Sequence, residues 1–306
     1  MQDGSRKAIV AAFVANLGIA IAKFIGFLIT GSAGLLAESG HSVADTGNQG
    51  LLLLGSKRSQ RSATGEHPFG FGRERYFWAF VVALVLFSMG GLFAIYEGIH
   101  KLQHPEPTDN PIVAYVILGL AVGLESFSLR TAMKEAGHLR RGRTWWQFIR
   151  TAKQPELPIV LLEDVGAEIG LLFALAGLTM AEITGNARWD AVGSLAIGLL
   201  LVVIAGILAV EMKGLLIGEA ADPAQVDAVH DAMVSIDPVR RVIHLRTEHI
   251  GPDELLVAAK LEFEPTLTFV ELADLIDEVE RRVRAAVPSA RVIYIEPDVY
   301  RADTSL

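Results

Sequence analysis

Residues 189–210 read WDAVGSLAIGLLLVVIAGILAV, a run in which Asp190 is the one ionisable side chain. A helix needs about 20 largely apolar residues to cross a membrane. Five further segments meet that requirement, separated by breaks rich in Gly, Pro and polar residues. They are residues 8–29, 33–54, 76–99, 111–132 and 157–180. The sequence therefore predicts a multi-pass α-helical membrane protein with six transmembrane helices.

The composition of the whole chain agrees with this prediction. Of the 306 residues, 51% are hydrophobic and 20% are charged, whereas a soluble domain carries about 25% charged residues. The net charge of −8 argues against nucleic acid as a partner. The chain has no Cys, which excludes disulfides and thiolate metal ligands. We expect no cleaved signal peptide, because the first apolar run is long and lacks a clear cleavage site.

Charge is distributed unevenly along the chain. Residues 1–213 contain 18 Lys and Arg against 17 Asp and Glu, whereas residues 214–306 contain 9 against 18. The apolar runs all lie in the first part. We interpret residues 1–213 as the transmembrane domain and residues 214–306 as a small acidic soluble domain.

The basic residues near the segment ends predict the orientation, because loops rich in Lys and Arg stay in the cytoplasm. The loops on one side contain just Lys101 and Arg188. The loops on the other side contain Arg6, Lys7, Lys57, Arg58, Arg61, Arg73, Arg75, Arg130, Lys134, Arg140, Arg141, Arg143, Arg150 and Lys153. Both termini and the acidic domain are therefore expected in the cytoplasm.

The second segment contains the polar run ESGHSVADTGNQ at residues 38–49. His41 and Asp45 are four residues apart and share one helical face. Asn48 and Gln49 follow one turn later. An imidazole nitrogen and a carboxylate oxygen so placed can bind one divalent cation. The alternative is an interhelical hydrogen bond that holds the bundle together.

The fifth segment contains LLEDVGAE at residues 161–168. Asp164 and Glu168 share a face, whereas Glu163 points about 100° away from Asp164. An ionisable group at the centre of a spanning helix costs about 2.5–3.5 kcal/mol, which favours a functional role.

Of three other ionisable residues in the segments, two have simpler interpretations. Lys23 is expected to pair with a helix carboxylate or to extend to the membrane interface. Asp190 begins its segment, where a helix cap is common. Glu125 is left without an assigned role.

Three motifs in this order resemble a known family. They are LLAESGHSVAD at residues 35–45, HPFGFGRE at 67–74 and WDAVGSLAIG at 189–198. The chain resembles the cation diffusion facilitators, which include the ZnT zinc transporters, over nearly its whole length. The resemblance implies a secondary transporter, not an enzyme, that exports divalent transition metals from the cytoplasm by proton antiport. It implies Zn2+ first, with Mn2+, Fe2+ or Co2+ as alternatives, and no cofactor besides the transported metal and protons.

One departure from the family pattern affects the expected metal ligands. Most zinc members carry a second HxxxD in the fifth segment, but Val160 stands four residues before Asp164 here. The Glu163-Asp164 pair instead resembles a divergent branch of the family. A site with one nitrogen and three oxygen ligands favours harder ions such as Mn2+ or Fe2+ without excluding Zn2+ or Co2+. The ligands that the resemblance implies are His41, Asp45, Asp164 and Glu168. Residues that could replace or support the fourth ligand are Glu163, Asn48 and Gln49.

Residues 214–306 predict an αββαβ domain. A helix begins at Asp222-Pro223, and two strands follow at residues 239–250 and 254–263. A capping box then opens a second helix at Thr268, and a last strand covers residues 291–296. The order suits a small α+β, ferredoxin-like fold and resembles the metallochaperone-like tail of the family. That resemblance implies a homodimer formed through the tail.

The family's regulatory metal sites look degraded in this sequence. Lys260, Tyr294 and Glu296 stand at metal-ligand positions of related tails, so we expect little or weak metal binding there. In the loop at residues 67–74, Phe71 replaces the usual partner of His67, and we expect that loop site to be absent. Arg73 and Glu219 match positions that form a salt bridge between the membrane and tail parts in the family.

Two other functions are alternatives to metal export. A membrane-embedded metallohydrolase would use the same ligands with a metal-bound water, but no HExxH or GxSxG motif occurs. A metal-sensing membrane scaffold would signal through the tail, where the expected histidines are missing. The compact six-segment design favours a bacterial inner membrane, with the lipid bilayer and a second copy of the chain as partners.

Overall fold

The computed structural model describes residues 3–140 and 142–301. The chain divides into two compact units. The first consists of residues 1–57 and 77–213, and the second of residues 58–76 and 214–306. The loop between the second and third predicted segments therefore groups with the C-terminal residues.

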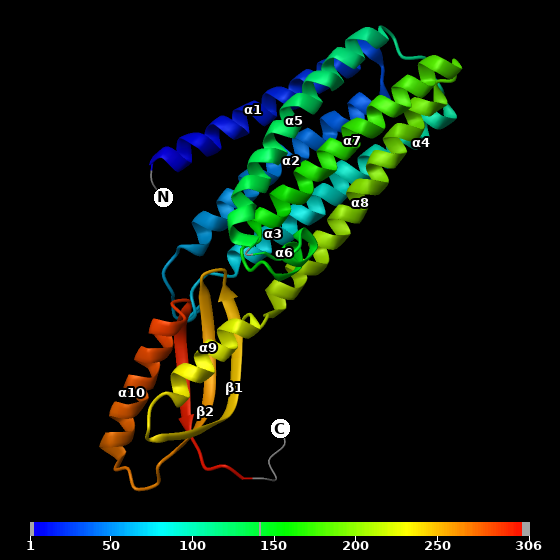
Figure 1. Cartoon of the computed structure of the whole chain (residues 1–306). Helices are drawn as coiled ribbons and strands as arrows, with labels where there is room; N and C mark the ends of the chain where they lie inside the picture. The colour runs from blue at the N-terminus through cyan, green and yellow to red at the C-terminus, as the bar shows by residue number, and fades with distance from the viewer. Residues whose placement is uncertain (1–2, 141, 302–306) are drawn as a thin grey trace. The chain divides into compact units, whose positions relative to one another are not determined.

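Long helices make up the first unit, and α5 packs between α1 and α7 (Figure 1). The third of them runs from α3 through a π-helical stretch, η1, into α4 without a break. The long helices are α1 (Asp3–Thr30), α2 (Ala33–Ser59), α3 (Glu74–Val85) with η1 (Leu86–Leu92) and α4 (Phe93–Gln103), α5 (Pro111–Arg140), α7 (Glu156–Thr184) and α8 (Arg188–Ile217). A short helix, α6 (Trp145–Thr151), precedes α7. The six predicted segments are confirmed as these six long helices.

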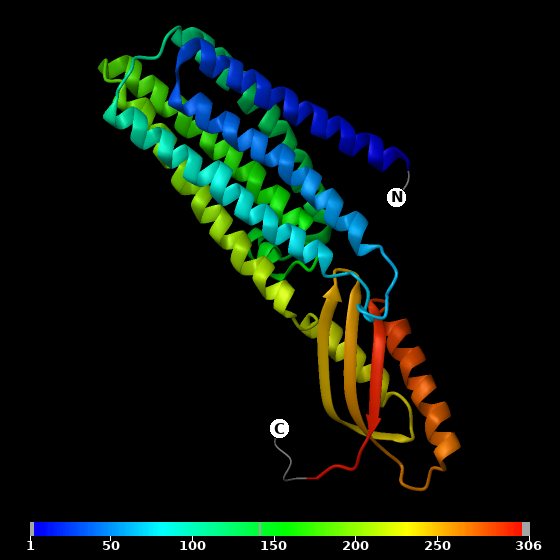
Figure 2. The ribbon, with the colours of Figure 1, turned by 180° about the vertical axis from the view of Figure 1, so that it is seen from behind.

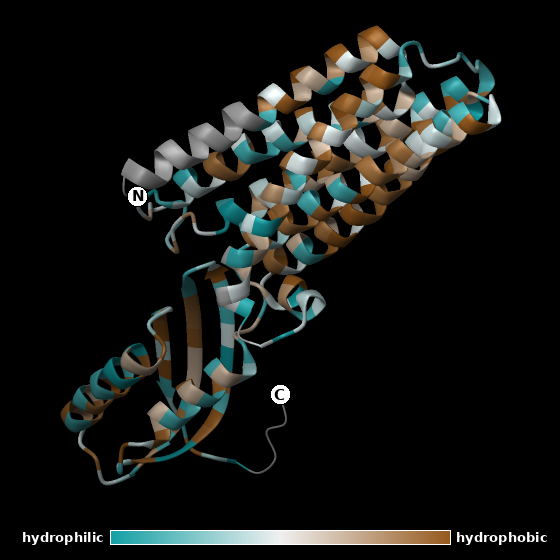
Figure 3. Cartoon of the chain, turned by 45° about the horizontal axis from the view of Figure 1, so that its top comes forward, coloured by the Kyte–Doolittle hydropathy of each residue, from teal (hydrophilic) through white to brown (hydrophobic). Residues whose placement is uncertain are grey.

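Hydrophobic residues dominate the long helices of this unit (Figure 3). Among the described residues, three helical stretches are long and apolar enough to cross a membrane by length and composition alone: Glu74–Gln103, Pro111–Lys134 and Arg188–Ile217. Asn16–Thr30 of α1 is a shorter apolar stretch. The remaining two long helices, α2 and α7, carry the buried polar residues of the candidate site.

Glycines bring α8 close to its neighbours on two sides. A Cβ on Gly193 would lie 2.9 Å from the Phe173 carbonyl oxygen and 3.4 Å from the Cα of Gly177 on α7. A Cβ on Gly198 would lie 2.7 Å from the backbone nitrogen of Ile95 on α4. Small residues allow this backbone contact, on which helix association in membranes depends.

Asp190 caps a helix, although not its own. Its Oδ2 accepts a 2.7 Å hydrogen bond from the Ala33 backbone N–H, and its Oδ1 accepts one of 2.9 Å from the Ser32 hydroxyl. The Lys101 ammonium lies 3.0 Å from Oδ2. The buried carboxylate of α8 thus satisfies the start of α2, where backbone N–H groups lack partners.

The second unit is a three-stranded sheet with two helices. Strands β1 (Val239–Gly251) and β2 (Glu254–Phe263) pair antiparallel, and β3 (Ala290–Pro297) pairs parallel to β2. Helices α9 (Pro223–Val234) and α10 (Phe269–Ala286) lie on one face of the sheet (Figures 1 and 2). This confirms the predicted αββαβ order.

The core of the second unit lies between the helices and one face of the sheet. Alternate residues of β2 are buried, as expected for a strand with one covered face. Both helices begin with a capping box, centred on Asp222 and Thr268. The core includes Val229, Met233, Leu255, Val257, Leu261, Val279 and Val283.

Candidate metal site

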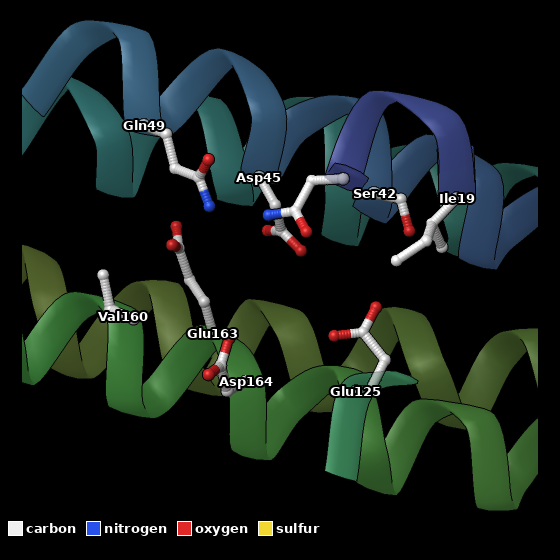
Figure 4. A pocket seen from close by; sticks show the side chains of 9 residues that line it. Ile19, Ser42, Asp45, Gln49, Glu125, Val160, Glu163 and Asp164 are labelled. Carbon is white, nitrogen blue, oxygen red and sulfur yellow. The ribbon is translucent and has the colours of Figure 1, made fainter. Parts of the chain in front are cut away.

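A small acidic cavity lies inside the first unit, among α1, α2, α5 and α7. Its volume is about 10 Å³, which is roughly the room that one water molecule needs. The side chains of Asp45, Glu125 and Glu163 project toward this space from different helices (Figure 4). The lining residues are Asn16, Ile19, Ser42, Asp45, Gln49, Glu125, Val160, Glu163 and Asp164.

His41 and Asp45 meet as their spacing predicts. The Nε2 atom of His41 lies 3.4 Å from the Oδ2 atom of Asp45. His41 is fully buried, and neither of its ring nitrogens makes a hydrogen bond to the described residues. The Oδ1 atom of Asp45 is buried and likewise without a hydrogen bond. Buried polar atoms normally have partners, so these atoms fit a place where a cation binds.

The three acidic residues of α7 have different surroundings. Asp164 accepts a 3.1 Å hydrogen bond from the Ser128 hydroxyl, and it lines the cavity. Glu163 also lines the cavity and accepts a 2.6 Å hydrogen bond from Asn48 of α2. Glu168 accepts a 2.8 Å hydrogen bond from Ser126 and is not among the lining residues.

The predicted ligands are therefore brought together in part. Among the described residues, no group of three His, Asp or Glu side chains stands close enough to hold a metal ion as the helices lie here. Asp45, Glu163 and Asp164 share the cavity, and His41 joins through Asp45. Gln49 lines the same space, whereas Asn48 acts through its bond to Glu163.

A buried lysine beside the cavity confirms one expectation and adds a residue. Lys23 pairs with a helix carboxylate, Glu38 of α2, with 3.1 Å between Nζ and Oε2. Its ammonium also lies 3.6 Å from Oε1 of Glu125 on α5. Glu125 lines the cavity, and sequence reasoning left it without a role. The sequence could have indicated a role for Glu125, because it is the one acidic residue of the predicted segment 111–132.

Arg73 and Glu219, the two residues of the predicted salt bridge, each have a neighbour in β1. Arg73 forms an ion pair with Glu248, and the neighbouring His249 N–H donates to the Glu219 carbonyl at 2.8 Å. The Arg73–Glu219 side-chain pair stays a prediction. In the loop, His67 packs on Phe71 with ring centroids 4.6 Å apart.

Lys260 of β2 forms ion pairs with two acidic residues near the end of the described tail. Its Nζ lies 3.0 Å from Glu296 and 3.2 Å from Asp298. Hydrogen bonds to Glu296 and Asp298 raise the pKa of Lys260 above its ordinary value. The two carboxylates therefore favour the charged form of the ammonium.

Comparison with known proteins defines the class. A model of the cation efflux transmembrane domain matches residues 9–217, and a model of the cation efflux protein cytoplasmic domain matches residues 221–298. The chain therefore belongs to the cation efflux family, the cation diffusion facilitators. This is a family of transporters and not of enzymes, so the metallohydrolase alternative is not retained.

Particular relatives carry more specific names. The mouse "Proton-coupled zinc antiporter SLC30A9, mitochondrial" is 32% identical over 266 residues, covering 85% of this chain and 46% of the mouse protein. Metal tolerance protein C4 of Arabidopsis thaliana is 31% identical, over 85% of this chain and 57% of the plant protein. Zinc transporter ZitB of Pectobacterium atrosepticum is 25% identical, over 83% of this chain and 75% of the bacterial protein. The chain spans about half the length of the SLC30A9 relatives it matches.

Proposed function

We propose that this chain exports a divalent transition metal from the cytoplasm in exchange for protons, with Zn2+ as the first candidate. The observation that carries the proposal is the buried His41–Asp45 pair, in which Asp45 lines a cavity together with Glu125, Glu163 and Asp164. The names of the mouse and bacterial relatives support zinc as the ion. Mn2+, Fe2+ and Co2+ remain alternatives, because an oxygen-rich site accepts harder ions.

The proposed ligands are His41, Asp45, Asp164 and Glu163. Glu163 takes the place that the sequence assigned to Glu168, because Glu163 lines the cavity and Glu168 instead bonds Ser126. A small approach of α2 and α7 would bring the four side chains onto one ion. Closure on the ion and opening after release would be part of the alternating access by which transporters move a central site between membrane faces.

Exchange with protons follows from the chemistry of these ligands. An imidazole binds metal when it is neutral, and a carboxylate binds when it is ionised. Protons and metal therefore compete for the same atoms. A proton gradient directed into the cytoplasm would displace the metal on the far side of the membrane and reset the site.

The remaining assignments concern the two domains and the membrane. Residues 1–213 would carry transport, and residues 214–306 would form a homodimer, which the match to the family's cytoplasmic domain supports. Both termini would face the cytoplasm of a bacterial inner membrane. The mitochondrial label of the SLC30A9 relatives makes a mitochondrial membrane the alternative.

Proteoliposomes containing the purified full chain test this proposal. Uptake of Zn2+, Mn2+, Fe2+ and Co2+ is measured with and without a pH gradient that is acidic inside. We expect uptake of at least one of these ions to rise with the gradient. Uptake of none of them, or uptake indifferent to the gradient, would contradict proton-coupled transport.

Matched variants decide the fourth ligand. Glu163→Gln and Glu168→Gln remove the same charge at positions five residues apart on α7. We expect Glu163→Gln to lose most of the metal flux and Glu168→Gln to keep it. The reverse order would restore Glu168 as the ligand.

A further inference from the structure

Lys23 of α1 has no exposed surface, although it lies in an apolar helix of a membrane domain. Its ammonium donates to Oε2 of Glu38 at 3.1 Å and to the hydroxyl of Ser42 at 2.9 Å. Removing a charged group from water costs several kcal/mol even after relaxation. A buried charge inside a membrane domain marks a functional place by default.

The surroundings of Lys23 connect it to the cavity. Ser42, which accepts its hydrogen bond, lines the cavity, and so does Glu125, 3.6 Å away. Four carboxylates line that space: Asp45, Glu125, Glu163 and Asp164. The ammonium is thus a positive charge just outside the cavity, in contact with the lining residues Ser42 and Glu125. These lining residues would face the transported cation.

Glu38 holds this ammonium in place. The carboxylate is fully buried, and its Oε1 has no hydrogen-bond partner among the described residues. A Cβ on Gly170 of α7 would collide with that Oε1 atom. Glycine at this position lets the carboxylate lie against α7, so Glu38 is packed between helices beside the ammonium.

We propose that Lys23 is a built-in counter-cation that limits the affinity of the cavity for the transported ion, an inference that rests on the proposed function. Its ammonium competes with the ion for Glu125 and repels the ion across the cavity wall. Like charges in a site shielded from water repel strongly, because screening is weak there. Moderate affinity allows release after each transport cycle, and Glu38 sets how far the ammonium reaches toward Glu125.

The proposal predicts opposite effects for the two members of the ion pair. Lys23→Met removes the repelling charge and should lower the Zn2+ dissociation constant at least about five-fold, with a lower kcat because release slows. Glu38→Gln frees the ammonium to turn toward Glu125 and should raise the dissociation constant at least about five-fold. A merely structural ion pair would move both variants in the same direction.

Zinc titration calorimetry on the full-length protein in detergent, together with proteoliposome flux, measures these effects. Lys101→Met is the matched control, since Lys101 is also buried and paired, with Asp190, but contacts none of the lining residues in the described contacts. Its zinc dissociation constant should equal that of the wild type. Size-exclusion profiles show which variants are folded.

Each outcome has a clear meaning. Opposite shifts in Lys23→Met and Glu38→Gln support the counter-cation, whereas parallel shifts or no shifts overturn it. If Lys23→Met does not fold, Glu38→Gln decides alone, with weaker zinc binding in support and unchanged binding against. A wild type that binds and transports no divalent cation would instead overturn the proposed function itself.

Discussion

Asn48 of α2 donates from Nδ2 to the Oε1 atom of Glu163 on α7 across 2.6 Å, and both side chains are buried. This hydrogen bond joins the two helices that carry the proposed ligands. It also holds a carboxylate oxygen of Glu163 at the wall of the cavity. Residues that hydrogen-bond to metal ligands orient those ligands, and the loss of such residues weakens metal binding.

Asn48→Ala should therefore weaken zinc binding about 10–100-fold, because Glu163 loses the donor that orients it. Titration calorimetry on the full-length protein measures the dissociation constant. Ser88→Ala is the control, since the Ser88 hydroxyl donates to a carbonyl of its own helix, that of Leu84, at 2.8 Å. Equal affinities for the two variants would remove Asn48 from the site.

Close contact between α7 and α8 makes a second prediction. Gly193→Ala should destabilise the protein by about 1–3 kcal/mol, because the added methyl group meets the backbone of α7. Gly206→Ala in the same helix meets nothing within 4 Å and should be neutral or mildly stabilising. Thermal unfolding in detergent compares them. A Gly193→Ala protein as stable as Gly206→Ala would show that the two helices separate readily.

The buried Lys101–Asp190 pair makes a third prediction. Asp190→Asn leaves the Lys101 ammonium buried without its counter-charge and should cost about 3–5 kcal/mol of stability. Asp190→Asn combined with Lys101→Met should recover part of that loss. Thermal unfolding of both variants measures the difference. A double variant less stable than Asp190→Asn would contradict this view of the pair.

The capping box of α10 predicts a dependence on pH. The Thr268 N–H donates to Oε2 of Glu271 at 2.8 Å, which lowers the pKa of Glu271. Stabilisation by the ionised carboxylate is therefore present above the ordinary pKa of Glu and lost as pH falls through the lowered value. Protection of the first-turn amides of α10 should decrease from about pH 6 to about pH 3.

Glu271→Gln should show a much smaller change over the same range, because the group no longer titrates. Hydrogen exchange of the full-length protein measures the protection, and Asp274→Asn in the same helix serves as the control. Equal pH dependence in wild type and Glu271→Gln would assign the effect to other groups.

Local patterns predicted much of this molecule. Run length predicts the long helices, and capping residues such as Thr268 predict where α10 begins. The pairing of His41 with Asp45 follows from a spacing of four residues within one helix. All of these features depend on neighbours in the sequence.

Features that depend on how helices pack were not predictable from the same patterns. Asp190 looked like a cap for its own helix, but it caps α2 because α8 packs against the start of that helix. Spacing alone favoured Glu168 over Glu163 as a partner of Asp164. The rotation of α7 against α2 and α5 places Glu163 beside Asn48 and Glu168 beside Ser126.

Zinc flux through Asp45→Asn tests the central claim most directly. Asp45 contacts His41 and lines the cavity, and the substitution removes a ligand charge while keeping the shape of the side chain. In proteoliposomes with an acidic interior, the wild type should accumulate zinc, and folded Asp45→Asn should accumulate none above empty vesicles. Zinc uptake by Asp45→Asn at the wild-type rate would contradict transport through this cavity.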